Sequence, residues 1–342
     1  MAKIDIFAPQ TFEMVSSLAG QKILIYGDSD TGKTKQTSRM EKPMLLMAES
    51  GGSACAIPKF PIPDWDTFTS IVDQLTADPE RTLETFQTTI VDSLEELVAR
   101  CEEKVAKKYH VVDVGMVQQA DPKNNPNGYT LARTMFKQQI NRLTSIGLTV
   151  VFISHSQEVD YTDPFTGETY KKFVPYGSEK EKGSTRFVRN LCDFVIFTQA
   201  SGIDPETGKT IYSKALCKET KRAFARSRYT QMQTFIEKFT AENLKEAIET
   251  AIKKEAENEC AGLVDFKQVE TGFTKEDYLS MIQPYMAKLY KLYPDYVTGV
   301  VAENLGENRR VSSATDDEVT ELGNIYSDFV TFACDRGIVI DN

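Results

Sequence analysis

Short apolar runs recur along the first part of the chain, and stretches with helical spacing lie between them. The runs occupy residues 22–26, 43–48, 88–92, 148–153 and 194–197. They are rich in Val, Ile and Leu without regular polar alternation, which is typical of strands buried on both faces of a parallel sheet. Helical spacing appears at 66–77, 94–108 and 131–146. The pattern predicts an α/β fold with a mostly parallel central sheet flanked by helices.

The pattern becomes helical beyond residue 240, with apolar stripes at 241–256, 275–293 and 319–329. Charge also separates the two parts. Residues 241–342 hold 20 Asp and Glu against 10 Lys and Arg, whereas the rest of the chain holds 30 of each. We therefore expect three regions: an N-terminal cover or arm at 1–20, an α/β core at 21–238, and an acidic helical C-terminal region at 239–342.

Composition excludes several classes of protein. No run of about 18 apolar residues is present, so we expect no membrane span. The start of the chain lacks the basic and apolar segments of a secretory signal. The six cysteines form no C-x-x-C pair and there are only two histidines, so we expect no zinc site and a cytoplasmic location. The acidic excess argues against a protein that coats nucleic acid by bulk charge.

The first apolar run leads into a glycine-rich loop with the pattern G-x-x-x-x-G-K-T, followed by a segment able to be helical. This is the phosphate-binding P-loop, whose backbone N–H groups surround phosphate oxygens at the N-terminus of a helix. We expect Lys33 to reach the β- and γ-phosphates of ATP and the Thr34 hydroxyl to ligate Mg²⁺. The expected nucleotide-binding residues are Gly27, Asp28, Ser29, Asp30, Thr31, Gly32, Lys33, Thr34 and Lys35.

Two further strands end in carboxylates. The run at 88–92 ends in Asp92, the Walker B pattern, which predicts a second Mg²⁺ ligand. Hydrolysis also needs a base for the attacking water. Ser93 follows Asp92, so that base must come from elsewhere, and Glu49 at the end of the run at 43–48 is the obvious donor. We expect Glu95 and Glu96, inside the next helix, to point away.

The run at 148–153 ends in Ser154 and His155, and we expect this strand to lie between the P-loop strand and the Walker B strand. His155 would then face the γ-phosphate, although a lone histidine is more often structural. The following residues include a D-P-x-T-G turn at 163–167, which recurs at 204–208 and suits a hairpin. Basic residues that are interleaved with aromatics there suit single-stranded nucleic acid. They are Lys171, Lys172, Lys180, Lys182, Arg186 and Arg189.

These motifs carry a resemblance to a known family. The strand at 89–93 (TIVDS) resembles the Walker B strand of RecA-type recombinases, and 47–49 (MAE) resembles their catalytic-glutamate strand. The layout of residues 20–230 is similar to the short RecA-like ATPases of bacteriophages. These include the Sak-type single-strand annealing proteins, which are grouped with the phage nucleotide-binding AAA-family ATPases. The acidic region beyond 240 has no counterpart in this resemblance.

The resemblance implies an ATP-driven hydrolase that acts on single-stranded DNA in phage recombination or replication, in the host cytoplasm. It also implies self-association into a ring or filament, because RecA-like subunits bind nucleotide at their boundaries. A neighbour's cation then completes the site, and Lys221 and Arg222 stand where that family carries such cations.

Other functions remain open from the residues alone. In one, the chain is a nucleotide-switched loader or adaptor whose acidic region binds a helicase or a single-strand-binding protein. A small-molecule kinase is less favoured, because no arginine-rich lid lies between the Walker motifs. No base-reading motif distinguishes ATP from GTP.

Overall fold

The computed structural model describes residues 13–49, 54–120, 127–178, 183–202, 205–206, 211–264, 275–315, 318–336 and 338. The chain divides into two compact units. One comprises Pro9–Gln268, and the other comprises Met1–Ala8 with Val269–Asn342. Each is described by itself.

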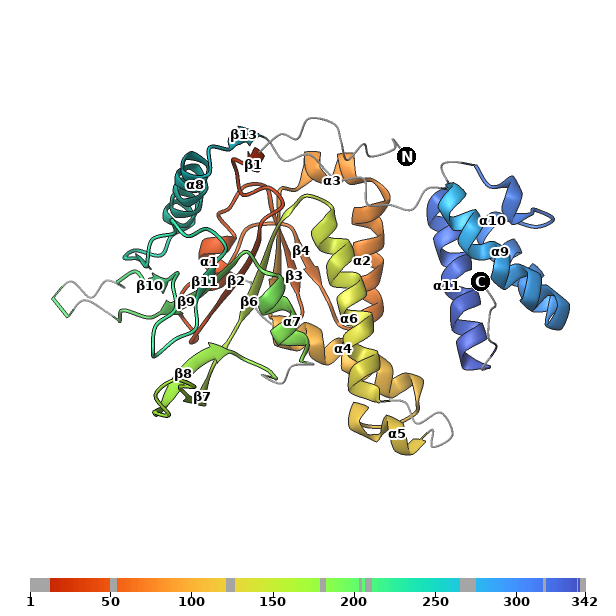
Figure 1. Ribbon diagram of the computed structural model, residues 1–342, viewed down its shortest axis with the longest axis horizontal. Coiled ribbons are helices and arrows are strands. Elements are labelled where there is room, and N and C mark those ends of the chain that lie inside the picture. Colours follow the sequence, from red (N-terminus) through yellow and green to blue (C-terminus); the bar gives the residue numbers. More distant parts are fainter. Residues whose placement is uncertain are drawn as a thin grey trace. The chain divides into compact units, whose positions relative to one another are not determined.

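A central sheet with helices packed against it forms the larger unit (Figure 1). The sheet has nine strands in the order β12-β10-β9-β2-β6-β5-β3-β4, with β11 also paired to β9. The six strands from β9 to β4 run parallel, and β10, β11 and β12 are antiparallel additions. Strand β6 lies between β2 and β5, which confirms the predicted order. The strands are β2 (Lys22–Gly27), β3 (Pro43–Met47), β4 (Lys59–Pro61), β5 (Thr88–Asp92), β6 (Thr149–Ser154), β9 (Phe194–Gln199), β10 (Lys214–Leu216), β11 (Arg226–Ser227) and β12 (Phe235–Ile236).

Both faces of the sheet are covered, which explains why its strands are continuously apolar. Alternate residues of one strand enter two different cores, as Leu24 and Ile25 of β2 do. Helices α2, α4 and α6 pack on the first face, and α8 packs on the second. The helices of this unit are α1 (Lys33–Thr37), α2 (Trp65–Ala77), α3 (Pro79–Thr85), α4 (Leu94–Lys108), η1 (Val114–Met116), α5 (Val117–Ala120), α6 (Gly128–Ser145), α7 (Ser184–Leu191) and α8 (Ala241–Asn258). The fold is the predicted RecA-like α/β architecture.

A two-stranded antiparallel hairpin leaves the sheet directly after β6. Its strands are β7 (Ser156–Thr162) and β8 (Thr169–Pro175). The Asp163 carboxylate accepts hydrogen bonds from the backbone N–H groups of Phe165 and Thr166, and the N–H of Gly167 bonds to the Asp163 carbonyl. The D-P-x-T-G turn at 163–167 is therefore confirmed. Most of the second such turn lies outside the described residues, although the strands on either side of it, β9 and β10, do pair.

The boundary between the units falls after α8 rather than before it. Helix α8 buries Leu244, Ile248 and Ile252 in the core that β2 also enters, so it belongs with the sheet and not with the helical region expected at 239–342. The structure describes no residue before 13, so most of the N-terminal cover expected at 1–20 lies outside it. Strand β1 (Glu13–Val15) pairs with β13 (Gly262–Val264).

The smaller unit is helical, with α9 (Lys275–Leu292), α10 (Pro294–Leu305), η2 (Val311–Ser313) and α11 (Val319–Asp335). Its core includes Ile282, Leu289, Leu322 and Phe329, each fully buried. The Glu318 side chain accepts a hydrogen bond from the Thr315 N–H at 2.7 Å, which is one half of a capping box ahead of α11. Helix α10 was not anticipated from the sequence.

Candidate functional site

The glycine-rich loop joins β2 to α1 with the backbone conformation that its sequence requires. Gly32, ahead of α1, has a φ of 81° in the left-handed region, which glycine adopts without steric cost. Lys33 is buried, and its Nζ donates to the carbonyl oxygens of Gly27 at 2.9 Å and Asp28 at 2.7 Å. Burial lowers the pKa of Lys33, although Asp92 and Glu95 oppose the change. The loop thus holds a cation at the start of a helix, where anions bind well.

Thr198, near the end of β9, packs against the glycine-rich loop. A Cβ on Gly27 would lie 2.1 Å from the Thr198 carbonyl oxygen, so only glycine fits there. The Thr198 hydroxyl lies 2.9 Å from the Thr31 hydroxyl and donates to the Tyr26 carbonyl at 3.1 Å. No pattern in the sequence indicates this role of Thr198, because it depends on β9 lying beside β2.

Thr34 and Asp92 meet at the carboxyl edge of the sheet. The Thr34 hydroxyl donates to Asp92 Oδ2 at 2.6 Å, which brings together the two predicted Mg²⁺ ligands. Burial is the main cause that raises the pKa of Asp92; the Thr34 hydrogen bond opposes it, and Glu49 adds to it. Within the described residues, no group of three or more His, Cys, Asp or Glu side chains has metal-binding geometry. The oxygen donors present fit Mg²⁺, which typically takes one or two protein oxygens and completes its shell with phosphates and water.

Glu49 comes from the neighbouring strand end. Its Oε2 accepts a hydrogen bond from the Ser93 hydroxyl at 3.0 Å, so Ser93 orients the carboxylate. Glu49 and Asp92 lie close enough for the charge of Glu49 to affect the pKa of Asp92. The structure therefore places Glu49 beside Asp92, the expected metal ligand.

The prediction that Glu95 points away from the site is wrong. Glu95 Oε1 accepts a hydrogen bond from the His155 backbone N–H at 3.0 Å and also contacts His155 Nδ1. Its other oxygen, Oε2, is buried and has no hydrogen-bond partner among the described residues. Glu95 lies in the first turn of α4, and that turn begins at the sheet edge that carries the loop. Glu95 thus holds both the backbone and the ring of His155 in position.

A pocket of about 290 Å³ collects most of these groups. It is lined by Ser29, Asp30, Thr31, Gly32, Lys33, Thr34, Lys35, Glu49, Asp92, Ile153 and His155. Seven of the nine expected nucleotide-binding residues, all except Gly27 and Asp28, therefore share one cavity with Glu49 and His155. Lys35 is exposed and its Nζ bonds to the Ala54 carbonyl at 2.8 Å. Four carboxylates lie near enough to Lys33 to act on its pKa, those of Asp28, Glu49, Asp92 and Glu95, so a bound polyphosphate would need an additional cation.

Lys221 and Arg222 do not line this pocket. They lie in a turn beside the β7–β8 hairpin, where the Arg222 carbonyl accepts a hydrogen bond from the Phe173 N–H at 2.7 Å. Lys221 forms an ion pair with Glu168 at 3.0 Å and is exposed. Both residues are therefore exposed on the surface.

The basic residues between Lys171 and Arg189 are less accessible to nucleic acid than the sequence suggests. Lys172 is buried, pairs with Glu219 and lies over the Tyr161 ring, and Arg189 is buried against the Phe224 ring. These two residues stabilise the fold and are not free to meet a phosphate backbone, which corrects the prediction. Lys171 is exposed and pairs with Asp160 at 2.9 Å. Lys180 and Lys182 lie outside the described residues.

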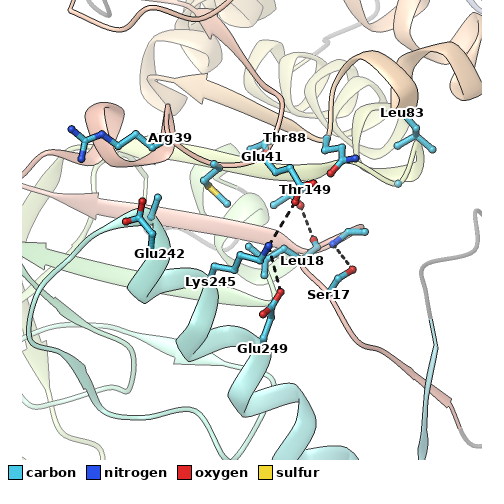
Figure 2. A pocket seen from close by; sticks show the side chains of 15 residues that line it. Ser17, Leu18, Arg39, Glu41, Leu83, Thr88, Thr149, Glu242, Lys245 and Glu249 are labelled. Carbon is cyan, nitrogen blue, oxygen red and sulfur yellow. Dashed lines mark hydrogen bonds and ion pairs between the residues drawn. The ribbon is translucent and has the colours of Figure 1, made fainter.

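A separate pocket of about 470 Å³ lies at the opposite edge of the sheet, where β5 and β6 begin (Figure 2). Lys245 of α8 stands there between Glu41 at 3.7 Å and Glu249 at 3.9 Å. The pocket contains none of the loop residues 27–35. It is therefore not part of the phosphate site.

The parallel sheet, the loop with its buried lysine and the Thr34–Asp92 pair define a P-loop NTPase with a RecA-like core. The chain belongs to the AAA domain family of ATPases, whose model matches residues 19–229. It is also 30% identical over 335 residues to the SPbeta prophage-derived uncharacterized protein YorG of Bacillus subtilis (strain 168), covering 95% of this chain and 97% of that protein. Nucleotide binding follows from this family.

Among solved structures, the chain is similar to the KaiC-like protein PH0186 of Pyrococcus horikoshii OT3. The two are 11% identical with a TM-score of 0.31, and the match covers 61% of this chain and 82% of that one. This likeness adds nothing to the topology given above. Within the described residues, no helix is both long enough and apolar enough to cross a bilayer.

Replacing Asp92 by Asn is expected to stabilise the protein without nucleotide and to remove its response to Mg²⁺. Because the folded-state pKa of Asp92 is raised, the folded protein binds more protons than the unfolded chain, and its stability falls as pH rises through that pKa. The Asn variant should therefore melt higher at neutral pH, and the difference should shrink as pH falls. A melting series with and without Mg²⁺–ATP measures both effects.

The melting series with Mg²⁺–ATP separates two effects of Asp92: the cost of its buried charge and its binding of the cation. Ligand at about 100 times its Kd stabilises the wild type by about 2.7 kcal/mol, and we expect Asp92→Asn to gain much less. Equal gains in both proteins would show that Asp92 does not hold the cation.

Proposed function

We propose that the protein hydrolyses ATP with Mg²⁺ and that single-stranded DNA stimulates this activity, as in phage recombination, annealing or replication. The observation that carries the proposal is the link between the phosphate loop and the β7–β8 hairpin. The hydroxyl of Ser156, the first residue of β7, donates to Asp28 Oδ1 in the loop at 2.5 Å. His155, one residue earlier, lines the pocket.

In this proposal each side chain of the pocket has a separate task. Lys33 holds the β- and γ-phosphates, and Glu49, oriented by Ser93, accepts a proton from the attacking water. Thr34 and Asp92 would hold Mg²⁺, which would supply neutralisation of charge on the phosphates. His155 faces the γ-phosphate, and its backbone continues into the hairpin, so the presence of that phosphate can change the position of β7.

We further propose that subunits self-associate and that Lys221 or Arg222 acts on the neighbour's nucleotide. Neither residue lines its own pocket, and both are exposed, as a residue that acts on a neighbour must be. The prophage origin of YorG agrees with the phage setting, and the Sak-type annealing group is our proposed assignment within the AAA family.

A hairpin truncation tests the DNA proposal. Residues 160–171 are replaced by Asn-Gly, which closes the hairpin between Val159 and Lys172, a pair in the native register. We expect binding to a labelled oligothymidylate to weaken at least tenfold and its salt slope to flatten by about 0.7, because Lys171 is the single cation among the replaced residues. Basal ATP turnover should survive, because the pocket is untouched.

Fluorescence anisotropy at several salt concentrations gives both quantities, and Lys104→Ala on α4 is the control. DNA affinity and salt slope equal to those of the wild type would remove the hairpin from DNA binding. A second outcome would favour the loader or adaptor function. In it, DNA changes ATP turnover equally in the truncated and wild-type proteins, and a helicase or a single-strand-binding protein raises wild-type turnover more than DNA does. The acidic composition of the smaller unit favours that second candidate.

A further inference from the structure

An open apolar groove runs along the smaller unit between α9, α10 and η2. Its cavity volume is about 1030 Å³. Ile282, Val297, Val301 and Val311 form its floor and are buried in the core of the unit. Tyr290 on its edge is 55% exposed, which is high for so large an aromatic side chain. The groove is therefore an apolar surface that the described part of this unit leaves uncovered.

A second hollow of about 440 Å³ adjoins the groove along α9 and shares Ala287 and Lys291 with it. It adds Leu292, which is 56% exposed. The two hollows together extend the apolar surface along the outer part of α9, so the surface suits an elongated occupant better than a compact small molecule.

The charge of this surface is opposite to that of its surroundings. Residues 269–342 hold 13 Asp and Glu against 6 Lys and Arg. The residues that line the groove nevertheless include Lys291, Arg309 and Arg310 and no carboxylate. Arg309 is committed to Glu318, with contacts of 2.5 and 2.9 Å. Lys291 and Arg310 are exposed and form no ion pair within the described residues, so both cations are available to a partner.

We propose that this groove binds an acidic amphipathic helix of another protein. Apolar side chains spaced at i, i+3, i+4 and i+7 would enter the groove, and carboxylates beside them would meet Lys291 and Arg310. An acidic partner is favoured because the groove offers cations alone, whereas a basic or neutral helix would meet the same apolar floor without complementary charge. The inference does not depend on the nucleotide site.

The test uses a fluorescein-labelled helical peptide of leucines and glutamates, about 14 residues long, and a matched peptide with lysines in place of the glutamates. We expect the glutamate peptide to bind the full-length protein with an affinity that falls with salt, and the lysine peptide to bind at least tenfold more weakly. The double variant Lys291→Glu with Arg310→Glu should weaken the glutamate peptide at least tenfold. Tyr290→Ala should also weaken it, without the same salt dependence.

The matched control carries the same change of charge on α8, as Lys253→Glu with Lys254→Glu, both at exposed positions. It should bind the glutamate peptide as the wild type does, and both double variants should keep the ATP affinity of the wild type. Equal loss in the two double variants would mean that net charge and not the groove governs binding, and no binding to the wild type would overturn the proposal. A dimer in light scattering that dissociates only in the groove variant would place a second copy there and would also overturn it.

Discussion

Lys33→Ala is expected to abolish ATP hydrolysis while leaving the protein folded. The Lys33 ammonium is buried at the mouth of the loop and bonds to two loop carbonyls, so its charge is positioned before a phosphate arrives. Removing one such preorganised group typically costs about 10²–10³ in turnover. The measurement is steady-state phosphate release, with circular dichroism to confirm the fold.

We expect the Lys33→Ala variant to be no less stable than the wild type, because Lys33 is buried. Because burial lowers its pKa, the charged ammonium is already unfavourable in the folded protein without nucleotide, so its removal should not destabilise the fold. Lys104→Ala, which removes an exposed lysine paired with Asp66, is the control and should keep full turnover. Turnover near that of the control in a folded Lys33→Ala protein would exclude this loop as the catalytic site.

Glu49→Gln is expected to bind Mg²⁺–ATP normally and to hydrolyse it roughly 10²-fold or more slowly, because a general base is lost. Gln keeps an oxygen to accept the Ser93 hydrogen bond, so the local geometry should survive. Single-turnover kinetics with a nucleotide-binding assay separate the two steps. A loss of binding equal to the loss of turnover would show that Glu49 holds nucleotide and does not act on water.

Glu95 provides the critical comparison for that assignment. It touches His155 and not the pocket, so Glu95→Gln should act through the orientation of His155. We expect a smaller fall in turnover than for Glu49→Gln, together with a reduced response to DNA. Normal turnover in Glu49→Gln with lost turnover in Glu95→Gln would reverse the two roles.

The sequence predicts the loop and the sheet well because both depend on local pattern. The spacing from Gly27 to Thr34 specifies a strand, a turn and a helix, and the apolar runs specify buried strands. The position of β6 between β2 and β5 follows from the class of sheet that the loop motif indicates. Helix α4 occupies the predicted residues, Leu94–Lys108, because its apolar stripe and its first-turn acids both favour that start. Thr34, Asp92 and Glu49 meet because parallel strands end at one edge.

What the sequence does not predict depends on contacts between distant segments. Glu95 lies in the first turn of a helix, where its spacing predicts a solvent-facing side chain. It instead accepts a hydrogen bond from the backbone of His155, a contact between distant segments that no local pattern reveals. Lys172 resembles a solvated base in a basic run, yet Tyr161 and Glu219 enclose it. Helix α8 looks like part of the acidic region, and only its burial on the sheet assigns it to the larger unit.

The most direct measurement is the rate of phosphate release from ATP by the wild-type protein, with Mg²⁺, in the presence and absence of single-stranded DNA. We expect measurable turnover that needs Mg²⁺ and that DNA increases, and we expect Lys33→Ala to lack it. Phosphate release no faster than that of Lys33→Ala, with and without DNA, would contradict the account, since the pocket formed by Lys33, Glu49 and Asp92 would then bind nucleotide without hydrolysing it.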